Sequence, residues 1–431
     1  MSDSACKPPC MKEFFLARQP ILNRAQDLFA YELLFRGAAA GPAEVIDDVS
    51  ATASVIAHAS ELGLENVVGD SLGFVNVDEA VLMSDFIQFL PKSRVVLEIL
   101  ETVKASDQLT ARVAELKRAG YMFALDDIVA ESDSVQRLLP HVEIVKIDIS
   151  NMPKSEVIRL GRKFQLAGKR LLAEKVETLV QFRHCLDLGF DYFQGYYFAK
   201  PMILTGRKLS HSQMVVMRLL AHIMSNADAA VLERSVKQDA SLGQTLLRMV
   251  NTAASGVRQP IDSIDQALTV MGRQQLQRWL HILLYAELGK SRGSPAPLLA
   301  LATTRSKLLE LVAQKIRPGD RNTSDTAFTV GIMSLMDALF GLPMEDILKR
   351  FPVSREVADA LLTRSGLYGD MLKLAEYIEH LKEAGPLVPP LLEKLQLSTE
   401  DLYALELDAF GWSDTICATQ ADAARTANGP Q

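Results

Sequence analysis

Acidic and polar residues follow a series of short apolar runs in this sequence of 431 residues. Asp126 and Asp127 end one such run, and Lys146 and Asp148 end the next. Carboxylate oxygens are the ligands that Mg²⁺ and Mn²⁺ prefer, and two such ions can clamp the attacking and leaving oxygens of a phosphodiester. Metal-dependent phosphodiester chemistry is therefore one expectation, and an inert fold whose acids only cap helices is the alternative. The other polar residues in this position are Glu32, Asn76, Glu98, Glu174 and Gln194.

The apolar runs alternate with amphipathic stretches, which predicts strands followed by helices. About eight strands fit before residue 204, and this favours a closed α/β barrel, a modified TIM barrel, whose strands present their carboxyl ends at one face. The sequence contains neither GxGxxG nor GxxxxGK[ST], the phosphate loops typical of open nucleotide-binding sheets. Strands are predicted at 14–18, 28–35, 72–77, 94–100, 121–125, 142–147, 170–173 and 191–198. Helices are predicted at 44–62, 78–89, 107–119, 154–167 and 178–188, with Asp78 and Asp107 as caps of the second and third.

The second half of the chain has helical periodicity and almost no alternating runs. Pro201 and Gly206 mark the change, which predicts an all-α helical bundle after the barrel. We expect a disordered leader at 1–12, the barrel at 13–204, the helical domain at 205–415 and a flexible tail at 416–431. Helices are predicted there at 213–227, 242–251, 264–271, 273–288, 297–315 and 327–340.

Composition bounds the classes of protein that this chain can belong to. The net charge is −7, so non-specific nucleic-acid binding is not expected. There is no apolar run of membrane-spanning length and no signal-peptide core, which predicts a cytoplasmic protein without a membrane partner. Cys6 and Cys10 form a CxxxC without a second pair, so we expect unpaired thiols rather than a zinc site.

The motifs of the first half resemble those of the EAL family of cyclic di-GMP phosphodiesterases. Glu32-Leu-Leu-Phe-Arg36 is similar to the E-A-L-x-R signature of that family. The resemblance covers about residues 14–204 and implies the modified TIM barrel fold. The other motifs follow in the family's order: Gln19-Pro-Ile, Asn76 in FVNV, Glu98-Ile-Leu-Glu101, Asp126-Asp127, Lys146-Ile-Asp148, Glu174-Lys-Val-Glu177 and Gln194-Gly-Tyr.

The resemblance implies a role for each matching residue. Lys146 and Glu174 would position and activate a water, and Mg²⁺ or Mn²⁺ would be the cofactor. Gln19, Arg36 and Gln194 would contact cyclic di-GMP. Glu101, Asp148 and Glu177 would support the site. The metal ligands would be Glu32, Asn76, Glu98, Asp126, Asp127 and Glu174.

Several supporting positions depart from the family pattern. The family has D-D-F-G-x-G after the central strand, where this chain has Ile128, Val129 and Glu131 in place of Phe and the two glycines. Because glycine adopts backbone conformations that Val129 resists, we expect this loop to fold differently. Lys175 replaces the glycine of AEGVE, and Leu100 the threonine of ExTE. Loss of supporting residues lowers metal affinity or activity roughly 10–100-fold, so the departures favour a degenerate site.

The helical half resembles the HDOD domain through Leu247-Arg248-x-x-Asn251-Thr252-Ala253 and Ser263-Ile264. Asn251 is expected to be a buried hook on loop backbone. His211, His222 and His281 have no following Asp, so the metal chemistry of HD phosphohydrolases is not expected. The resemblance implies a protein-interaction module.

The sequence alone leaves three hypotheses about function open. The first is a non-catalytic EAL–HDOD signalling protein that senses cyclic di-GMP, or has lost it, and acts through protein contacts. The second is an active or weakly active phosphodiesterase that produces the linear dinucleotide. The third is an unrelated role for the barrel. Family barrels commonly dimerise, so a homodimer is an expectation, and motility or biofilm control is the process that the resemblance suggests.

Overall fold

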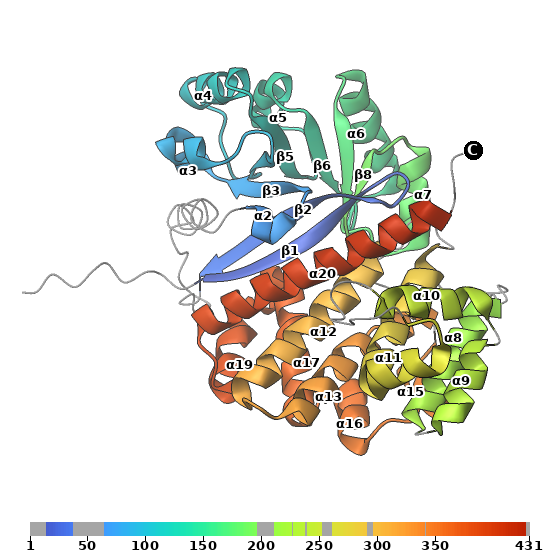
Figure 1. Ribbon diagram of the computed structural model, residues 1–431. Coiled ribbons are helices and arrows are strands. Elements are labelled where there is room, and N and C mark those ends of the chain that lie inside the picture. The colour runs from blue at the N-terminus through green and yellow to red at the C-terminus, as the bar shows by residue number, and fades with distance from the viewer. Residues whose placement is uncertain are drawn as a thin grey trace, which may run out of the picture. The chain divides into compact units, whose positions relative to one another are not determined.

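The computed structural model describes residues 14–37, 64–195, 211–225, 227–237, 239–251, 261–290, 296–340 and 342–427 (Figure 1). The chain divides into two compact units, one made of the described residues in Met1–Tyr197 and Leu374–Gly411, the other of those in Phe198–Lys373 and Trp412–Gln431. The leader, the predicted helix 44–62, Pro201, Gly206, Cys6 and Cys10 lie outside the described residues. The proposed domain limits stay a prediction.

Eight strands close into a barrel in sequence order, which confirms the predicted fold class (Figure 1). The first strand runs antiparallel to both of its neighbours, and the other strands are parallel. The opening hairpin is confirmed and is longer than predicted, whereas the last strand is shorter. The strands are β1 (Phe14–Asn23), β2 (Leu28–Gly37), β3 (Leu72–Val77), β4 (Val95–Ile99), β5 (Met122–Ile128), β6 (Ile144–Asp148), β7 (Arg170–Glu174) and β8 (Tyr192–Phe193).

Helices lie around the outside of the strands (Figure 1). Asp78 caps α3 as predicted, but Ser106 caps α4, because its hydroxyl and not the Asp107 carboxylate accepts the Leu109 N–H. The helix predicted at 78–89 is broken at Ser84. The elements are α2 (Glu65–Val68), α3 (Glu79–Met83), η1 (Asp85–Phe89), α4 (Asp107–Arg118), α5 (Asp133–Leu138), η2 (Leu139–His141), α6 (Lys154–Leu166) and α7 (Leu179–Asp187).

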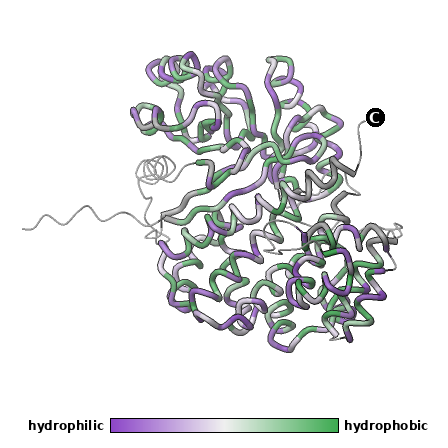
Figure 2. The backbone as a smooth tube through the Cα atoms, viewed as in Figure 1, coloured by the Kyte–Doolittle hydropathy of each residue, from purple (hydrophilic) through white to green (hydrophobic). Residues whose placement is uncertain are grey.

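The centre of the barrel is filled by an apolar layer to which every strand contributes one residue. Figure 2 shows hydrophobic and hydrophilic residues alternating along the helices, as expected of helices with one buried face. Since side chains alternate along a strand, the residue two positions away points into the barrel as well. The layer consists of Ile21, Ala30, Phe74, Val96, Ala124, Ile144, Leu172 and Tyr192.

The rest of the described chain is helical, as predicted for the second half. One helix spans the two predicted at 264–271 and 273–288, with Gly272 at φ 70° as the kink between them. The last helix also runs through most of the predicted tail. These helices are α8 (His211–Met224), α9 (Ala229–Lys237), α10 (Ala240–Val250), α11 (Ile264–Lys290), α12 (Ala296–Ile316), α13 (Arg321–Met333), α14 (Met336–Phe340), α15 (Met344–Arg350), α16 (Arg355–Thr363), α17 (Gly366–Glu379), α18 (Leu381–Ala384), η5 (Gly385–Leu387), α19 (Val388–Leu395) and α20 (Thr399–Ala427).

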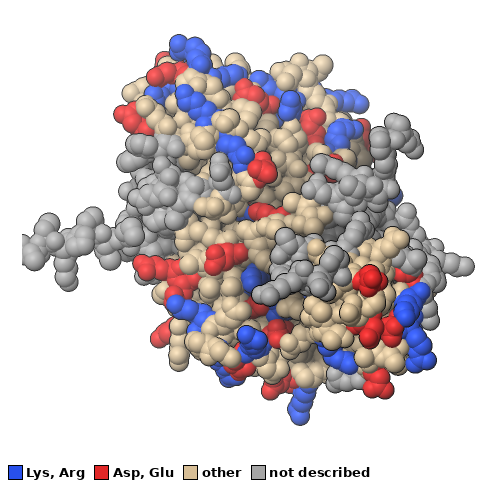
Figure 3. All heavy atoms as spheres, viewed as in Figure 1, with Lys and Arg blue, Asp and Glu red and all other residues tan. Residues whose placement is uncertain are grey.

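Within the described residues, no single helix has the length and apolarity needed to cross a membrane. One pair, Arg321–Phe340 with Met344–Arg350, meets that test only when both are taken together across a bend of 111°. On the face shown in Figure 3, acidic and basic residues are interspersed over the described surface.

Gly195, at the end of the barrel, lies very close to the backbone of Val176 in the segment after β7. A Cβ there would lie 2.3 Å from Val176 N, and φ is +146°. We expect Gly195→Ala to lower the free energy of unfolding by roughly 2–4 kcal/mol. Gly168→Ala is the matched control, since φ is +72° and nothing lies within 4 Å, so it should cost only about 1 kcal/mol of backbone strain. Urea unfolding of the full chain measures both, and equal losses would contradict this assignment.

Candidate functional site

A polar layer lies directly above the apolar layer of the barrel. Its members stand two residues further toward the mouth on each strand, and Gln19 precedes Ile21 because β1 runs in the opposite direction. Strand register places Gln19 beside Glu32 and Asn76 beside Glu98. The sequence-predicted residues therefore come together as one ring: Gln19, Glu32, Asn76, Glu98, Asp126, Lys146, Glu174 and Gln194.

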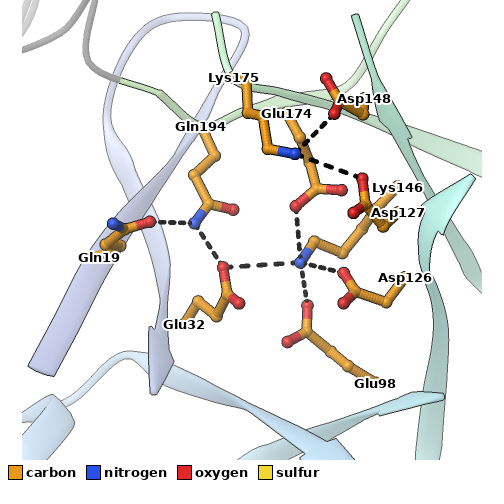
Figure 4. A network of polar contacts seen from close by, with 10 residues as sticks. All are labelled: Gln19, Glu32, Glu98, Asp126, Asp127, Lys146, Asp148, Glu174, Lys175 and Gln194. Carbon is orange, nitrogen blue, oxygen red and sulfur yellow. Dashed lines mark hydrogen bonds and ion pairs between the residues drawn. The ribbon is translucent and has the colours of Figure 1, made fainter. Parts of the chain in front are cut away.

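The Lys146 ammonium lies at the centre of this ring and is fully buried (Figure 4). Its Nζ lies 2.7 Å from Glu98 Oε1, 2.7 Å from Asp126 Oδ1, 3.0 Å from Glu174 Oε1 and 3.6 Å from Glu32 Oε2. Four buried carboxylates without a cation would be strongly unfavourable, since each loses its hydration. Lys146 is therefore the counter-ion of the ring in this structure.

A pair of glutamine side chains closes the ring on the β1–β2 side (Figure 4). Gln194 Nε2 donates to Glu32 Oε2 at 2.5 Å and to Gln19 Oε1 at 3.0 Å. Gln19 Nε2 in turn donates to the Glu379 carbonyl at 3.4 Å within the same unit. Both predicted nucleotide-contacting glutamines thus belong to the same hydrogen-bonded network as Glu32.

The protonation of the ring reflects the competition between burial and Lys146. Burial raises the pKa of Glu98 well above its usual value and that of Glu174 to about 7, because Lys146 only partly offsets the lost hydration and the neighbouring acids. Burial opposes the charge of Lys146, but the four carboxylates outweigh it and raise the lysine pKa. If all four groups were ionised, the ring would carry more negative charge than one ammonium can balance, so burial favours the protonated forms of Glu98 and Glu174.

A second group of charged side chains lies above the ring. Two of its residues do not follow the alternation of side chains along a strand. Asp127 and Lys175 have φ of 48° and 53°, in the left-handed region that side chains rarely adopt. Lys175 Nζ donates to Asp148 Oδ2 at 2.6 Å and lies 3.6 Å from Asp127 Oδ1 (Figure 4). Burial opposes ionisation of Asp148, but hydrogen bonds from Lys175 and Ser150 outweigh it and lower the carboxyl pKa. These three residues form a salt-bridged cap.

The donor chemistry of the site fits a hard cation. Several buried oxygens accept no hydrogen bond within the described part of the chain, and such oxygens are the ligands that Mg²⁺ and Mn²⁺ favour. However, no three acidic, histidine or cysteine side chains of the described residues share one position suited to a metal, because the carboxylates turn toward Lys146. The residues able to hold a cation are those with oxygens that no described group contacts closely: Asn76 Oδ1, Glu98 Oε2, Asp127 Oδ1 and Glu174 Oε2.

Three residues with implied roles are not part of this arrangement. Glu101 and Glu177 are exposed, and the backbone N–H of Glu177 donates to Gln181 Oε1. Arg36 lies on β2 opposite Phe15, and its side chain is outside the described residues. Their roles stay predictions.

The loop after Asp127 is held by contacts that sequence reasoning did not predict. Ile128 extends β5 and is buried, whereas Val129 is 59% exposed. Glu131 forms ion pairs with Arg159, at 2.5 Å, and with Lys163. Arg159 and Lys163 stand four residues apart on α6, a spacing that puts both on one face. The sequence indicates these ion pairs only through that spacing, which does not identify Glu131 as the partner.

Comparisons with known proteins agree with this architecture. The EAL domain family matches residues 10–201, and the HDOD domain family matches residues 209–342. The uncharacterized protein YuxH of Bacillus subtilis is 31% identical over 93% of this chain and 98% of its own length. The cyclic di-GMP phosphodiesterase CdgJ of Vibrio cholerae is 33% identical over 93% of both chains. This chain belongs to the EAL–HDOD family.

A solved standalone EAL protein of Vibrio cholerae, in its c-di-GMP bound form, is 26% identical to this EAL–HDOD protein. The similarity covers 44% of this chain and 93% of that chain, with a TM-score of 0.36.

In the HDOD half of this EAL–HDOD protein, the prediction for Asn251 is confirmed in its contacts and wrong in its burial. Asn251 Nδ2 donates to the carbonyls of Leu247 and Ile261, and Ile261 N–H donates to Asn251 Oδ1 at 2.7 Å. Asn251 is therefore the predicted hook on loop backbone, but it is exposed and not buried. His281 is 1% exposed, which lowers its pKa to about 3.

Lys146→Met should destabilise the barrel. Removing the ammonium leaves the ring carboxylates without their counter-ion, so we expect a loss of about 3–5 kcal/mol at neutral pH. The loss should shrink at pH 5, where more of these carboxyl groups take up protons. Lys154→Met, at an exposed position on α6, should stay within about 0.5 kcal/mol of wild type. Urea midpoints at both pH values test this, and equal midpoints for the two variants would refute it.

His281 should make unfolding of the helical part sensitive to mild acid. Its folded pKa of about 3 lies below the unfolded value, so the unfolded chain binds the proton first as pH falls through 6.5. Between pH 7.5 and 5.5 this one group should lower the free energy of unfolding by about 1.4 kcal/mol. His281→Phe should remove that part of the pH dependence and leave the change between pH 7.5 and 8.5 as in wild type. If the free energy of unfolding of His281→Phe changes with pH below pH 7 as it does in wild type, this prediction is wrong.

Proposed function

We propose that this EAL–HDOD protein binds cyclic di-GMP at the mouth of its barrel and acts as a receiver of that signal without efficient hydrolysis. The proposal is based on the complete polar ring, whose carboxylates lie close to the ammonium groups of Lys146 and Lys175. Gln19 and Gln194 lie in the ring and have amide groups suited to a dinucleotide. Lys146 and Lys175 add positive charge where phosphates would approach. Together they supply binding groups, while the carboxylates do not share a metal position.

A second candidate is a weakly active phosphodiesterase that produces the linear dinucleotide. The orphaned oxygens of Asn76, Glu98, Asp127 and Glu174 favour it, as does the similarity to CdgJ. A bound Mg²⁺ or Mn²⁺ would polarise the phosphodiester and lower the pKa of a water. Glu174, which lies beside Lys146 in the ring, would be the group that accepts a proton from that water.

The output of the protein would pass through the helical domain to a protein partner. The HDOD match supports this part of the proposal, and motility or biofilm control is the process that we propose it regulates. Residues 374–411 belong to the same compact unit as the barrel, so a truncation at 205 would remove part of that unit. Point variants of the full chain are therefore the cleaner way to separate nucleotide binding from partner recruitment.

The test uses the full chain with cyclic di-GMP and either Mg²⁺ or Mn²⁺. Calorimetry measures binding, and chromatography measures the linear product. We expect binding with little or no product, and Gln194→Ala should weaken binding by roughly tenfold because a hydrogen-bonding partner is lost. Glu79→Ala, an exposed acid on α3, is the control and should bind as wild type.

Two outcomes would overturn this proposal. Clear turnover that Glu32→Ala abolishes would favour the phosphodiesterase. Neither binding nor turnover would leave a role in protein contacts alone.

A further inference from the structure

The structure points to Lys175 as a built-in cation: we propose that its ammonium takes the place of one divalent ion between Asp127 and Asp148. The wild-type barrel would then hold one metal ion fewer than its acids could otherwise bind. This inference concerns the same barrel mouth as the proposed function and does not otherwise depend on it.

The contacts of Lys175 are those expected of a bridging cation. Asp127 is the last residue but one of β5 and Asp148 ends β6, and the ammonium of Lys175, which directly follows β7, points toward both (Figure 4). Its Nζ lies 2.6 Å from Asp148 Oδ2 and 3.6 Å from Asp127 Oδ1. A cation that joins carboxylates from neighbouring strand ends is what a divalent ion would provide there.

A second observation shows that the site still has capacity for a cation. Glu174, adjacent to Lys175, is 6% exposed, and its Oε2 accepts no hydrogen bond from the described residues. Asp127 Oδ1 likewise accepts none, because the Lys175 ammonium at 3.6 Å is too far for a hydrogen bond. Lys175 therefore balances charge at this point without satisfying the oxygens as a metal would.

The backbone at Lys175 also indicates a constrained position. Its φ of 53° is one that glycine adopts freely and a lysine adopts at a cost. The next residue is held, since Val176 N–H donates to the Gln194 carbonyl at 3.0 Å. The side chain is held as well, since the ammonium of Lys175 donates to Asp148 Oδ2.

Charge balance gives the direction of the effect. The ring and cap hold six carboxyl groups and two ammonium groups, and replacing Lys175 by a neutral residue removes one positive charge. The lost charge leaves Asp127 and Asp148 available to a divalent ion.

The experiment measures Mn²⁺ binding to the full chain by electron paramagnetic resonance, without substrate or turnover. Lys175→Gly and Lys175→Asn should each raise Mn²⁺ affinity about tenfold or more, or add one bound ion per chain. Asn is included because it is neutral and tolerates the left-handed conformation. Lys175→Arg should bind Mn²⁺ as wild type, and so should Lys154→Asn, which removes a positive charge from an exposed site.

Unchanged Mn²⁺ binding in folded Lys175→Gly and Lys175→Asn would overturn the inference. So would an equal gain in the variant that combines Ile128→Phe, Val129→Gly and Glu131→Gly with Lys175 retained, because the loop would then be the block. Cyclic di-GMP binding in the presence of Mn²⁺, measured on the same samples, separates the two proposals. A wild type that binds no nucleotide refutes the proposed function and leaves the Mn²⁺ result to decide on Lys175.

Discussion

A single buried ammonium group makes the polar interior of this barrel possible. Lys146 lies among four carboxylates that the strand period points into one small volume. Burial of an unpaired charge costs several kcal/mol, and the raised pKa values of Glu98 and Glu174 show that Lys146 offsets this only in part. The ring consequently favours the binding of a cation or of protons by its carboxyl groups.

The ring and the cap above it depend on different parts of the structure. Ring residues stand on strands, except for Gln194, which directly follows β8, and their directions follow from hydrogen-bonded register and from the apolar layer below. Asp127 and Lys175 instead depend on two left-handed residues. Substitutions in the loops can therefore alter the cap while the ring persists. Strained backbone of this kind is commonly found at functional sites.

The loop between β5 and α5 shows how a different sequence can still produce order. Without the two glycines of the family pattern, Ile128 continues the strand and is buried, and Glu131 anchors the loop to α6. Ser132 then caps α5 by accepting the Val135 N–H. The barrel unit also includes part of the C-terminal chain, since the Arg18 guanidinium lies 4.3 Å from the Tyr31 ring and 4.1 Å from the Phe410 ring.

The amino-acid sequence alone was enough to predict the closed barrel, the helical second half and the ring from Glu32 to Gln194. Strand alternation is local, so residues two apart can be assigned to one face without knowing the fold. It was not enough to predict the cap. Asp127 and Lys175 leave the alternation only because of their positive φ, and the ion pair of Lys175 with Asp148 joins residues on different strands. The supporting roles implied for Glu101 and Glu177 stay predictions, and in the folded chain both residues are exposed. Only the tertiary structure decided which cation meets which acid, because that depends on backbone reversals and on contacts between distant segments.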